Sequence, residues 1–308
     1  MELDGGVAVV TGGARGIGAS LARGLVDAGM AVVVADIDSG TAEETASSLR
    51  NGGARARAIS CDVGLLESVE SLAKTVWDEF GRVDLLVNNA GVSHPPAPAI
   101  DLTPSDARWV LETNVMGVWH GCSSFGRLMV EQSGEAHIVN VASEHSLGVP
   151  LPGQAMYTAS KHAILGLSDV LRRELPDRIG VSVAVPGSVQ TEFIAAVRNR
   201  PERFGGAATP MRDRIPVGMT ADEVAVRIIS GVRAGDFYIA THPPAVELAG
   251  ERWREISSAF DRHAPRFDGD ELLDTRELVR RREASAASAA EGTASAAEGV
   301  LDANREVD

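Results

Sequence analysis

A tyrosine and a lysine stand four positions apart in the stretch YTASK, residues 157 to 161. A phenol with an ordinary pKa of about 10 is a poor proton donor or acceptor near neutral pH. On a helix, positions i and i+4 share one face, so the ammonium of Lys161 would lie near the hydroxyl of Tyr157. Such a pair could be a tuned acid and base, or part of a polar stripe on a solvated helix. The spacing alone does not choose between them, so the surrounding elements must.

The surrounding chain alternates apolar, β-rich runs with amphipathic helical stretches. Several runs are apolar at successive positions, which is typical of strands covered on both faces. The predicted strands are 7–11, 31–36, 57–63, 83–91, 136–143, 180–187 and 237–241. The helical stretches between them include 17–28, 65–80, 104–131, 155–175 and 221–233. This alternation predicts an α/β fold with a Rossmann-type, doubly wound parallel sheet of about seven strands and helices on both faces.

A glycine-rich turn, TGGARGIG at 11–18, joins the first strand to the first helix. Gly12, Gly16 and Gly18 let the backbone turn tightly and approach a pyrophosphate, whose charge suits a helix N-terminus. The spacing is G-x-x-x-G-x-G rather than the commoner G-x-G-x-x-G. The position between a strand and a helix favours a nucleotide site over a plain loop.

The second strand ends at Asp36. An acidic residue there can accept hydrogen bonds from the adenosine ribose and would repel a 2′-phosphate. Alternatively Asp36 caps the next helix, although Asp38 and Ser39 could also do so. Arg15, beside the phosphate turn, would favour NADP. Because Asp36 would sit at the 2′ oxygen itself, NAD is the predicted cofactor and NADP the less favoured one.

The composition argues against several classes of protein. With 43 acidic and 29 basic residues the net charge is −14, so neither a nucleic acid nor a membrane is a predicted partner. Two cysteines indicate no disulfide framework, and seven histidines show no ligand spacing, so no metal is predicted. The chain lacks a signal-like start and an apolar run near the roughly 20 residues that span a bilayer, and we expect it in the cytoplasm.

Seven features occur in a fixed order along the chain. They are TGGARGIG, Asp62, NNAG (88–91), Asn114, Ser143, Tyr157 with Lys161, and PGSVQT (186–191). Together they resemble the short-chain dehydrogenase/reductase (SDR) family, over roughly residues 3 to 242. The glycine pattern and NNAG are similar to its compact single-domain branch. The resemblance implies an NAD(P)-dependent alcohol dehydrogenase or reductase that interconverts a secondary alcohol and a ketone by hydride transfer.

The resemblance implies four catalytic residues. Tyr157 would be the acid/base, with Lys161 lowering its pKa and binding the nicotinamide ribose. Opposite charges about 4 Å apart at an effective dielectric of about 20 attract by about 4 kcal/mol, or roughly three pK units, opposed in part by desolvation. Ser143 would polarise the carbonyl or steady the alkoxide. Asn114, a mediocre helix former, would kink its helix and hold a water in a proton relay.

One departure from the family concerns the serine. Fourteen positions separate Ser143 from Tyr157, one more than is usual, and a loop containing Pro and Gly at 144–156 carries the extra residue. Ser146 is therefore a competitor for the serine role.

The resemblance also implies a cofactor site along the carboxyl edge of the sheet. Asp62 and Val63 would hold the adenine ring, and 88–91 would pack against the adenosine half. Thr191 would hold the nicotinamide carboxamide or cap the next helix, and both roles are compatible. The predicted cofactor-binding residues are Gly12, Arg15, Gly16, Ile17, Gly18, Asp36, Asp62, Val63, Asn89, Ala90, Gly91, Tyr157, Lys161, Pro186, Gly187, Val189 and Thr191.

Beyond the motifs, the chain is predicted to divide into three parts. Residues 1–243 form the catalytic domain, in which the long connection 192–219 serves as a substrate lid. Residues 244–284 form a helical extension, with helices near 244–262 and 270–283. The Ala/Ser/Glu/Gly-rich stretch 285–308 is predicted to be a disordered tail.

The substrate follows only from a looser resemblance. The lid and the stretch 237–256 are similar to a subgroup with a longer C-terminus, which favours a bulky apolar or aromatic alcohol. Two interpretations are open for His145, Met156, Phe193 and Trp119: each lines the substrate pocket, or each is an ordinary core or surface residue. By resemblance, helices near 104–131 and 155–175 would pair in a homodimer or homotetramer. Two alternatives remain: a catalytically silent nucleotide-binding protein, and an NAD-dependent isomerase or epimerase.

Overall fold

The computed structural model describes residues 1–148, 151–207 and 217–281. The chain divides into two compact units, Met1–Arg252 and a second that begins at Trp253. The change of unit falls inside a long helix, α8 (Ala245–His263). The prediction places the end of the catalytic domain somewhat earlier, at residue 243.

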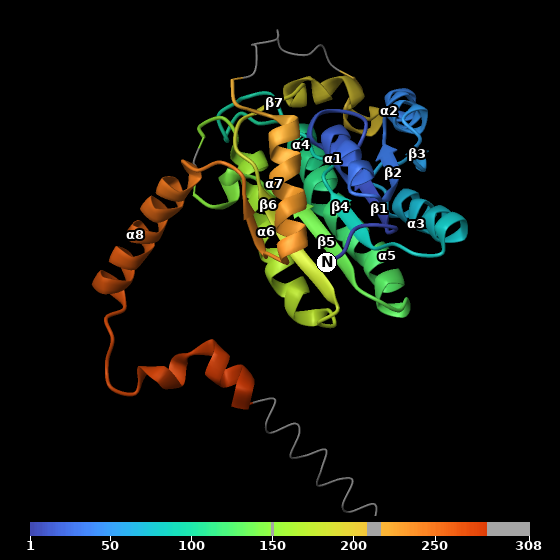
Figure 1. Cartoon of the computed structure of the whole chain (residues 1–308). Coiled ribbons are helices and arrows are strands. Elements are labelled where there is room, and N and C mark those ends of the chain that lie inside the picture. The colour runs from blue at the N-terminus through green and yellow to red at the C-terminus, as the bar shows by residue number, and fades with distance from the viewer. Residues whose placement is uncertain (149–150, 208–216, 282–308) are drawn as a thin grey trace, which may run out of the picture. The chain divides into compact units, whose positions relative to one another are not determined.

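Seven strands form one sheet in the order β3-β2-β1-β4-β5-β6-β9, and every neighbouring pair is parallel (Figure 1). Their bounds are β1 Val7–Thr11, β2 Ala31–Asp36, β3 Ala56–Ser60, β4 Leu85–Asn88, β5 Ala136–Val141, β6 Ile179–Val185 and β9 Tyr238–Ala240. The predicted fold class is confirmed. Because the strand order reverses between β1 and β4, their carboxyl ends open a crevice in which ligands of such sheets bind.

Helices cover both faces of this sheet. The bounds are α1 Gly16–Asp27, α2 Ser39–Asn51, α3 Leu66–Phe80, α4 Pro104–Leu111, α5 Gly117–Glu131, α6 Ala155–Glu174 and α7 Ala221–Ala234. Alternate side chains of a strand point to opposite faces. In β1, Ala8 and Val10 join a core with α1, α2 and α7, whereas Val7 and Val9 join one with α3, α5 and α6. Burial on both faces explains why the strands read as continuous apolar runs.

The helix predicted over 104–131 is not continuous. A π-helix at Glu112–Met116 separates α4 from α5, and Asn114 lies within it. The wider turn accommodates one additional residue, and such insertions are frequent at functional sites. A π-helix thus lies where the sequence predicts a kink at Asn114.

The predicted lid has a frame that the sequence did not reveal. Its ends are joined by a short parallel pair, β7 (Val189–Gln190) and β8 (Met219–Thr220). Between them lie two 3₁₀ segments, Phe193–Asn199 and Glu202–Phe204. Residues 208–216 of the predicted lid lie outside the described residues.

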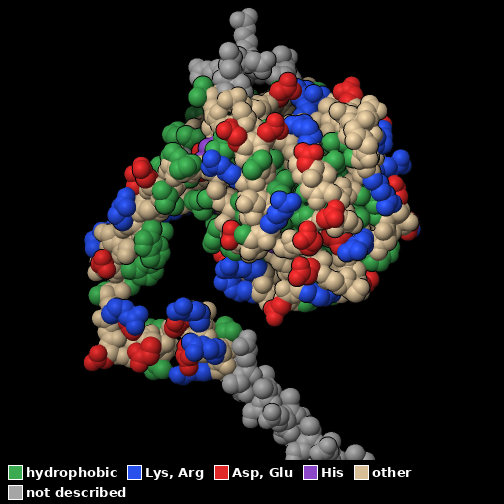
Figure 2. Space-filling model, in the orientation of Figure 1, with side chains coloured by type: hydrophobic (Ala, Val, Ile, Leu, Met, Phe, Trp, Pro, Cys, Tyr) green, Lys and Arg blue, Asp and Glu red, His purple; other side chains and the backbone are tan. Residues whose placement is uncertain are grey.

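The C-terminal extension begins with α8 and continues through a 3₁₀ segment at Asp270–Leu273 and a helix over 275–281. Apolar side chains gather along α8 (Figure 2). Those of Val246, Trp253, Ile256 and Phe260 are exposed. The last residues of the predicted extension, 282–284, and the predicted tail, 285–308, are outside the described residues. Within the part of the chain that is described, no helix is long and apolar enough to cross a membrane.

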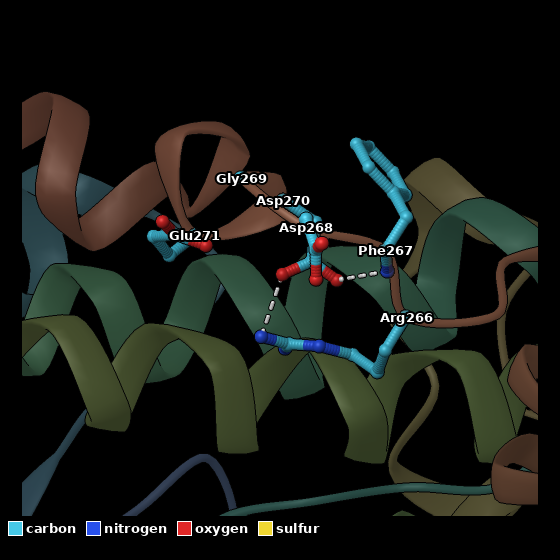
Figure 3. A pocket seen from close by; sticks show the side chains of 6 residues that line it. All are labelled: Arg266, Phe267, Asp268, Gly269, Asp270 and Glu271. Carbon is cyan, nitrogen blue, oxygen red and sulfur yellow. Dashed lines mark hydrogen bonds and ion pairs between the residues drawn. The ribbon is translucent and has the colours of Figure 1, made fainter.

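An open pocket in the second unit is formed by a single stretch of chain, 266–271 (Figure 3). Arg266 pairs with Asp270 at 2.6 Å, and the backbone N–H of Phe267 donates to the same carboxylate at 3.2 Å. The pocket contains none of the predicted site residues, which lie instead at the carboxyl edge of the sheet.

Candidate active site

The glycine-rich turn between β1 and α1 is packed too closely for side chains. Gly12 and Gly16 have φ values of 61° and 54°, a region that favours glycine. A Cβ added to Gly12 would lie 2.7 Å from Cα of Ala90, and one added to Gly18 would lie 2.1 Å from the carbonyl oxygen of Gly12. The result is a bare backbone cradle at a helix N-terminus, which fits a pyrophosphate.

Asn89 fixes this turn from the end of β4. Its Nδ2 donates to the carbonyl oxygens of Thr11 at 2.9 Å and Gly12 at 3.0 Å. In return, Thr11 Oγ1 accepts from the backbone N–H groups of Asn89 and Ala90, both at 3.1 Å. The NNAG motif thus positions the phosphate turn. Gly91 continues toward the catalytic residues, since its Cβ position is 3.5 Å from Lys161 Nζ.

Asp36 lies at the end of β2, next to the turn. Its two oxygens accept from the backbone N–H groups of Ala14 at 3.1 Å and Asp38 at 3.0 Å. Burial raises the pKa of Asp36, although these hydrogen bonds oppose the rise. The N-cap of α2 is Asp38, which accepts from Thr41 N at 3.1 Å, so the capping alternative for Asp36 is wrong. Arg15 donates to Asp38 at 3.1 Å.

Replacing Asp36 tests its contact with the ribose. Asp36→Ala should narrow the ratio of kcat/KM for NAD to that for NADP by about tenfold or more, because it removes a ribose acceptor and a charge that repels a 2′-phosphate. Steady-state kinetics with both cofactors measure the ratio. Asp27→Ala, an exposed carboxylate near the end of α1, is the matched control. An unchanged ratio in Asp36→Ala would remove this residue from cofactor selection.

Asp62 and Val63 follow β3, where the adenine ring is predicted to bind. Asp62 Oδ1 accepts from Gly64 N at 3.0 Å, and Oδ2 pairs with Nη1 of Arg203 at 2.7 Å. The buried Val63 packs on α5, and its carbonyl oxygen is 2.8 Å from His120 Nδ1. Arg203 comes from the 3₁₀ segment Glu202–Phe204 of the predicted lid and was not among the predicted site residues.

Tyr157 lies near the start of α6, and its ring contacts two aromatic neighbours. His145 and Phe193 approach it edge-on, with ring centroids 5.1 and 5.7 Å away. Burial raises the pKa of Tyr157 to about 12, a hydrogen bond with Ser143 opposes the rise, and the carboxylate of Glu144 adds to it. Two of the candidate pocket residues therefore flank the phenol. Met156 is half-buried, and Trp119 is 43% exposed on α5.

Ser143 follows β5 and is buried. Its Oγ donates to the carbonyl oxygen of Pro186 at 3.3 Å and accepts from the backbone N–H of His145 at 3.3 Å. The competing Ser146 donates its hydroxyl to the carbonyl oxygen of Ser143 at 2.5 Å. Of the two serines, Ser143 is the one that influences the pKa of Tyr157.

Lys161 lies one turn further along α6 and is 3% exposed. Its Nζ donates to the carbonyl oxygen of Val141 at 2.9 Å and is 5.6 Å from the centroid of the Tyr157 ring. Burial lowers the pKa of Lys161 to about 7. Burial disfavours the charged form of each residue, so it raises the pKa of Tyr157, lowers the pKa of Lys161 and opposes the stabilised tyrosinate that the spacing predicts.

The buried lysine makes stability depend on pH. Between pH 7 and 10 the unfolded chain, with an ordinary lysine pKa, binds more protons at this position than the folded one. The free energy of unfolding therefore rises with pH. From pH 7 to 9 the wild type should gain about 2 kcal/mol relative to Lys161→Met, which lacks this titration. Urea unfolding of both proteins at pH 7, 8 and 9 measures the difference. Parallel pH profiles would contradict a lowered lysine pKa.

Asn114 is fully buried in the π-helix. Its Oδ1 accepts from Val92 N at 2.8 Å, and its Nδ2 donates to Val92 O at 2.9 Å and Ser160 Oγ at 3.0 Å. Ser160 in turn donates to the carbonyl oxygen of Tyr157 at 2.7 Å. Protein groups thus engage both polar atoms of the amide. Ser160, not predicted as a site residue, connects the π-helix to α6, and its place inside YTASK was the available signal.

Residues 186–189 run along the same edge of the sheet. The backbone N–H of Gly187 donates to Nδ1 of His242 at 2.9 Å, and Nε2 of His242 lies 2.8 Å from the carbonyl oxygen of Ser188. His242 therefore supports this loop through both ring nitrogens. Sequence reasoning missed it, although it follows a predicted strand and carboxyl ends of parallel strands share one edge.

Thr191 contacts the phosphate turn rather than capping a helix. Its Cγ2 lies 3.0 Å from the Cβ position of Gly16, and its N–H donates to Val189 O at 2.8 Å. The 3₁₀ segment that follows has Glu192 at its N-cap, so the alternative of a Thr191 cap is wrong. The half-buried Ile17 packs against the core beneath the turn.

The comparisons with known proteins agree with this arrangement. The short chain dehydrogenase family profile matches residues 6–202. A D-threitol dehydrogenase of Mycolicibacterium smegmatis is 37% identical over 231 residues, covering 74% of this chain and 86% of the relative. An SDR from Burkholderia phymatum in complex with NAD has a TM-score of 0.80 at 34% identity, covering 87% of this chain and 98% of that one.

A gluconate 5-dehydrogenase from Burkholderia cenocepacia, in complex with NADP and tartrate, has a TM-score of 0.66 at 26% identity, covering 79% of this chain and 96% of that one. Members similar to this chain thus include proteins solved with NAD and with NADP. On the family profile, the relatives and the fold together, the chain belongs to the short-chain dehydrogenase/reductase family of oxidoreductases.

Proposed function

We propose that this protein is an NAD-dependent dehydrogenase or reductase that interconverts a secondary alcohol and a ketone. The observation that carries the proposal is that buried Ser143, Tyr157 and buried Lys161 come together at the end of β5. Lys161 Nζ is 5.6 Å from the centroid of the Tyr157 ring and donates to the carbonyl oxygen of Val141, two residues before Ser143. These residues lie at the carboxyl edge of β5, where ligands of open α/β sheets bind.

In the oxidative direction Tyr157, as the tyrosinate, takes the hydroxyl proton of the alcohol and becomes the phenol, and Ser143 holds the same oxygen. Bound NAD supplies the hydride acceptor. Lys161, whose ammonium is within reach of the phenol ring, stabilises the tyrosinate once the proton leaves. In the reductive direction Tyr157 returns the proton.

Asn114 is the proposed start of the path by which this proton reaches solvent. Because both polar atoms of its side chain are engaged by Val92 and Ser160, its contribution through the side chain is to fix the π-helix against α6. A backbone carbonyl of the π-helix would then have to hold the relay water. The altered hydrogen bonding of a π-helix leaves such acceptors free.

The preference for NAD rests on two carboxylates at the end of β2. Asp36 has free lone pairs beyond its two backbone hydrogen bonds, and its charge opposes a 2′-phosphate. Arg15, the residue that would favour NADP, is paired with Asp38 at 3.1 Å. Its positive charge is therefore already balanced.

A bulky apolar or aromatic alcohol is the proposed substrate class. His145 and Phe193 present aromatic edges beside the Tyr157 ring and would contact such a group. Because similar proteins are named for D-threitol and gluconate, polyols and sugar acids are the substrates against which apolar alcohols must be compared.

We also propose a homodimer or homotetramer, located in the cytoplasm. Exposed apolar side chains lie on α4, α5, α6 and the π-helix, and pairing of these helices would cover them. They are Leu111, Met116, Trp119, Val130 and Val170.

A panel of secondary alcohols with NAD, and of ketones with NADH, tests the proposal through NADH absorbance. Turnover of one or more apolar alcohols is the expected result. Cofactor binding without turnover across the panel would instead identify a silent nucleotide-binding protein. A changed product without net NADH formation would identify an isomerase or epimerase.

A further inference from the structure

Arg203 connects the lid segment to the predicted adenine site. Its Nη1 pairs with Asp62 Oδ2 at 2.7 Å, and its Nε donates to Glu112 Oε1 at 2.8 Å. The side chains of Arg203 and Glu112 are about one-third exposed, and that of Asp62 is 19% exposed. One guanidinium thus joins the end of β3, the first residue of the π-helix and the lid segment.

The neighbours of Arg203 hold it in this place. Phe204 is buried against Trp109 of α4, and its carbonyl oxygen accepts from Ser105 Oγ at 2.7 Å. Arg200 pairs with Asp106 through side chains only 12% and 15% exposed. The segment 193–204 is therefore docked on α4 by contacts independent of Asp62.

The two oxygens of Asp62 are both oriented. Gly64 N donates to Oδ1, and Arg203 donates to Oδ2. A carboxylate held by a charge-assisted hydrogen bond keeps further lone pairs for a second donor, such as an exocyclic amine. Without Arg203, only the N–H of Gly64 would hold the Asp62 carboxylate. The carboxylate could then rotate, and no positive charge would offset its repulsion with Glu112.

We infer that Arg203 is a positioning residue for the adenosine half of the cofactor, acting through Asp62, and that adenosine binding and docking of segment 193–204 stabilise each other. The inference rests on the proposed role of Asp62 in the NAD site. The guanidinium of Arg203 belongs to segment 193–204 and also orients the predicted adenine acceptor, Asp62. Docking of the segment therefore favours adenosine binding, and adenosine binding favours docking by the same factor.

Calorimetric titration of the full-length protein with ADP-ribose and, separately, with nicotinamide mononucleotide tests the inference. Arg203→Ala should weaken ADP-ribose binding by about tenfold or more and leave the affinity for nicotinamide mononucleotide within about twofold. Arg203→Lys keeps the charge but lacks the planar guanidinium that contacts Asp62 and Glu112 through separate nitrogens, so it should recover only part of the loss. Arg200→Ala weakens docking on α4 but leaves the Arg203–Asp62 pair in place. Through the coupling it should lose some ADP-ribose affinity, by no more than about threefold and clearly less than Arg203→Ala.

Chymotrypsin cleavage after Phe204, followed by mass spectrometry, reads the docking directly. ADP-ribose should slow this cleavage in the wild type and in Arg200→Ala, but not in Arg203→Ala. If Arg203→Ala is insoluble, Arg203→Gln carries the same expectation. The inference would be overturned, and the proposed cofactor site would stand, if the Arg203 variants bound ADP-ribose with wild-type affinity. The same holds if Arg200→Ala lost as much ADP-ribose affinity as Arg203→Ala. A wild-type protein that does not bind ADP-ribose would overturn the proposed cofactor site as well.

Discussion

Tyr157→Phe should lower kcat by about 10³-fold or more while the affinity for NAD changes by less than about threefold. The substitution removes only the hydroxyl oxygen, so the edge-on contacts of the ring with His145 and Phe193 are retained. Proton transfer to and from the substrate oxygen then depends on water. Steady-state turnover and NAD titration by fluorescence, on the same protein preparation, measure the two quantities.

The chain offers a matched control because it contains two tyrosines. Tyr238, on β9, is 51% exposed and packs its ring against Phe237. Tyr238→Phe should keep kcat within about twofold of the wild type. Near-normal turnover in Tyr157→Phe would reject its role in proton transfer, whatever the control shows.

The second large effect concerns the phosphate turn. Gly18→Ala should weaken NAD binding by about 100-fold or more, because the added Cβ would lie 2.1 Å from the carbonyl oxygen of Gly12 and 2.7 Å from Asn89 Nδ2. The turn must open to relieve this overlap, and Asn89 then loses the hydrogen bonds that hold it. Calorimetric titration with NAD and thermal unfolding report binding and stability separately.

Gly126 in α5 is the control, since a Cβ placed there meets no atom within 4 Å. Alanine is favoured over glycine inside a helix by about 0.5–1 kcal/mol, so Gly126→Ala should raise Tm slightly and leave NAD affinity unchanged. Gly18 also lies inside a helix, where propensity alone would favour the alanine. Normal NAD affinity in Gly18→Ala would show that the turn tolerates a side chain and is not a close-fitting cradle.

The fold was predictable because its signals are local. Buried strands such as β1 and β2 are continuous apolar runs, and glycines with positive φ mark the turn between β1 and α1. Asn114 was recognisable as a misfit in a helix, but its π-helix was not, since that geometry depends on the fit of the amide between Val92 and Ser160.

The contacts that sequence reasoning missed join distant parts of the chain. Arg203 and Asp62 are 141 positions apart, and His242 supports a loop 54 and 55 positions earlier. No periodicity or motif relates such pairs. The Tyr157–Lys161 spacing predicted proximity, but the pKa of each group is set by burial, which is a property of the packed molecule.

The π-helix at Glu112–Met116 also sets the relative phase of the two helices it joins. In an α-helix each residue advances about 100° around the axis, so one additional residue in the turn rotates everything before it relative to everything after it. This allows Trp109 of α4 to meet the lid segment while Val118 of α5 faces the sheet. Removing one residue from the turn would rotate α4 about its axis and move Asp106 and Trp109 away from Arg200 and Phe204. The length of the π-helical turn therefore determines how the surface of α4 that contacts the predicted lid is oriented relative to the sheet with the predicted cofactor residues.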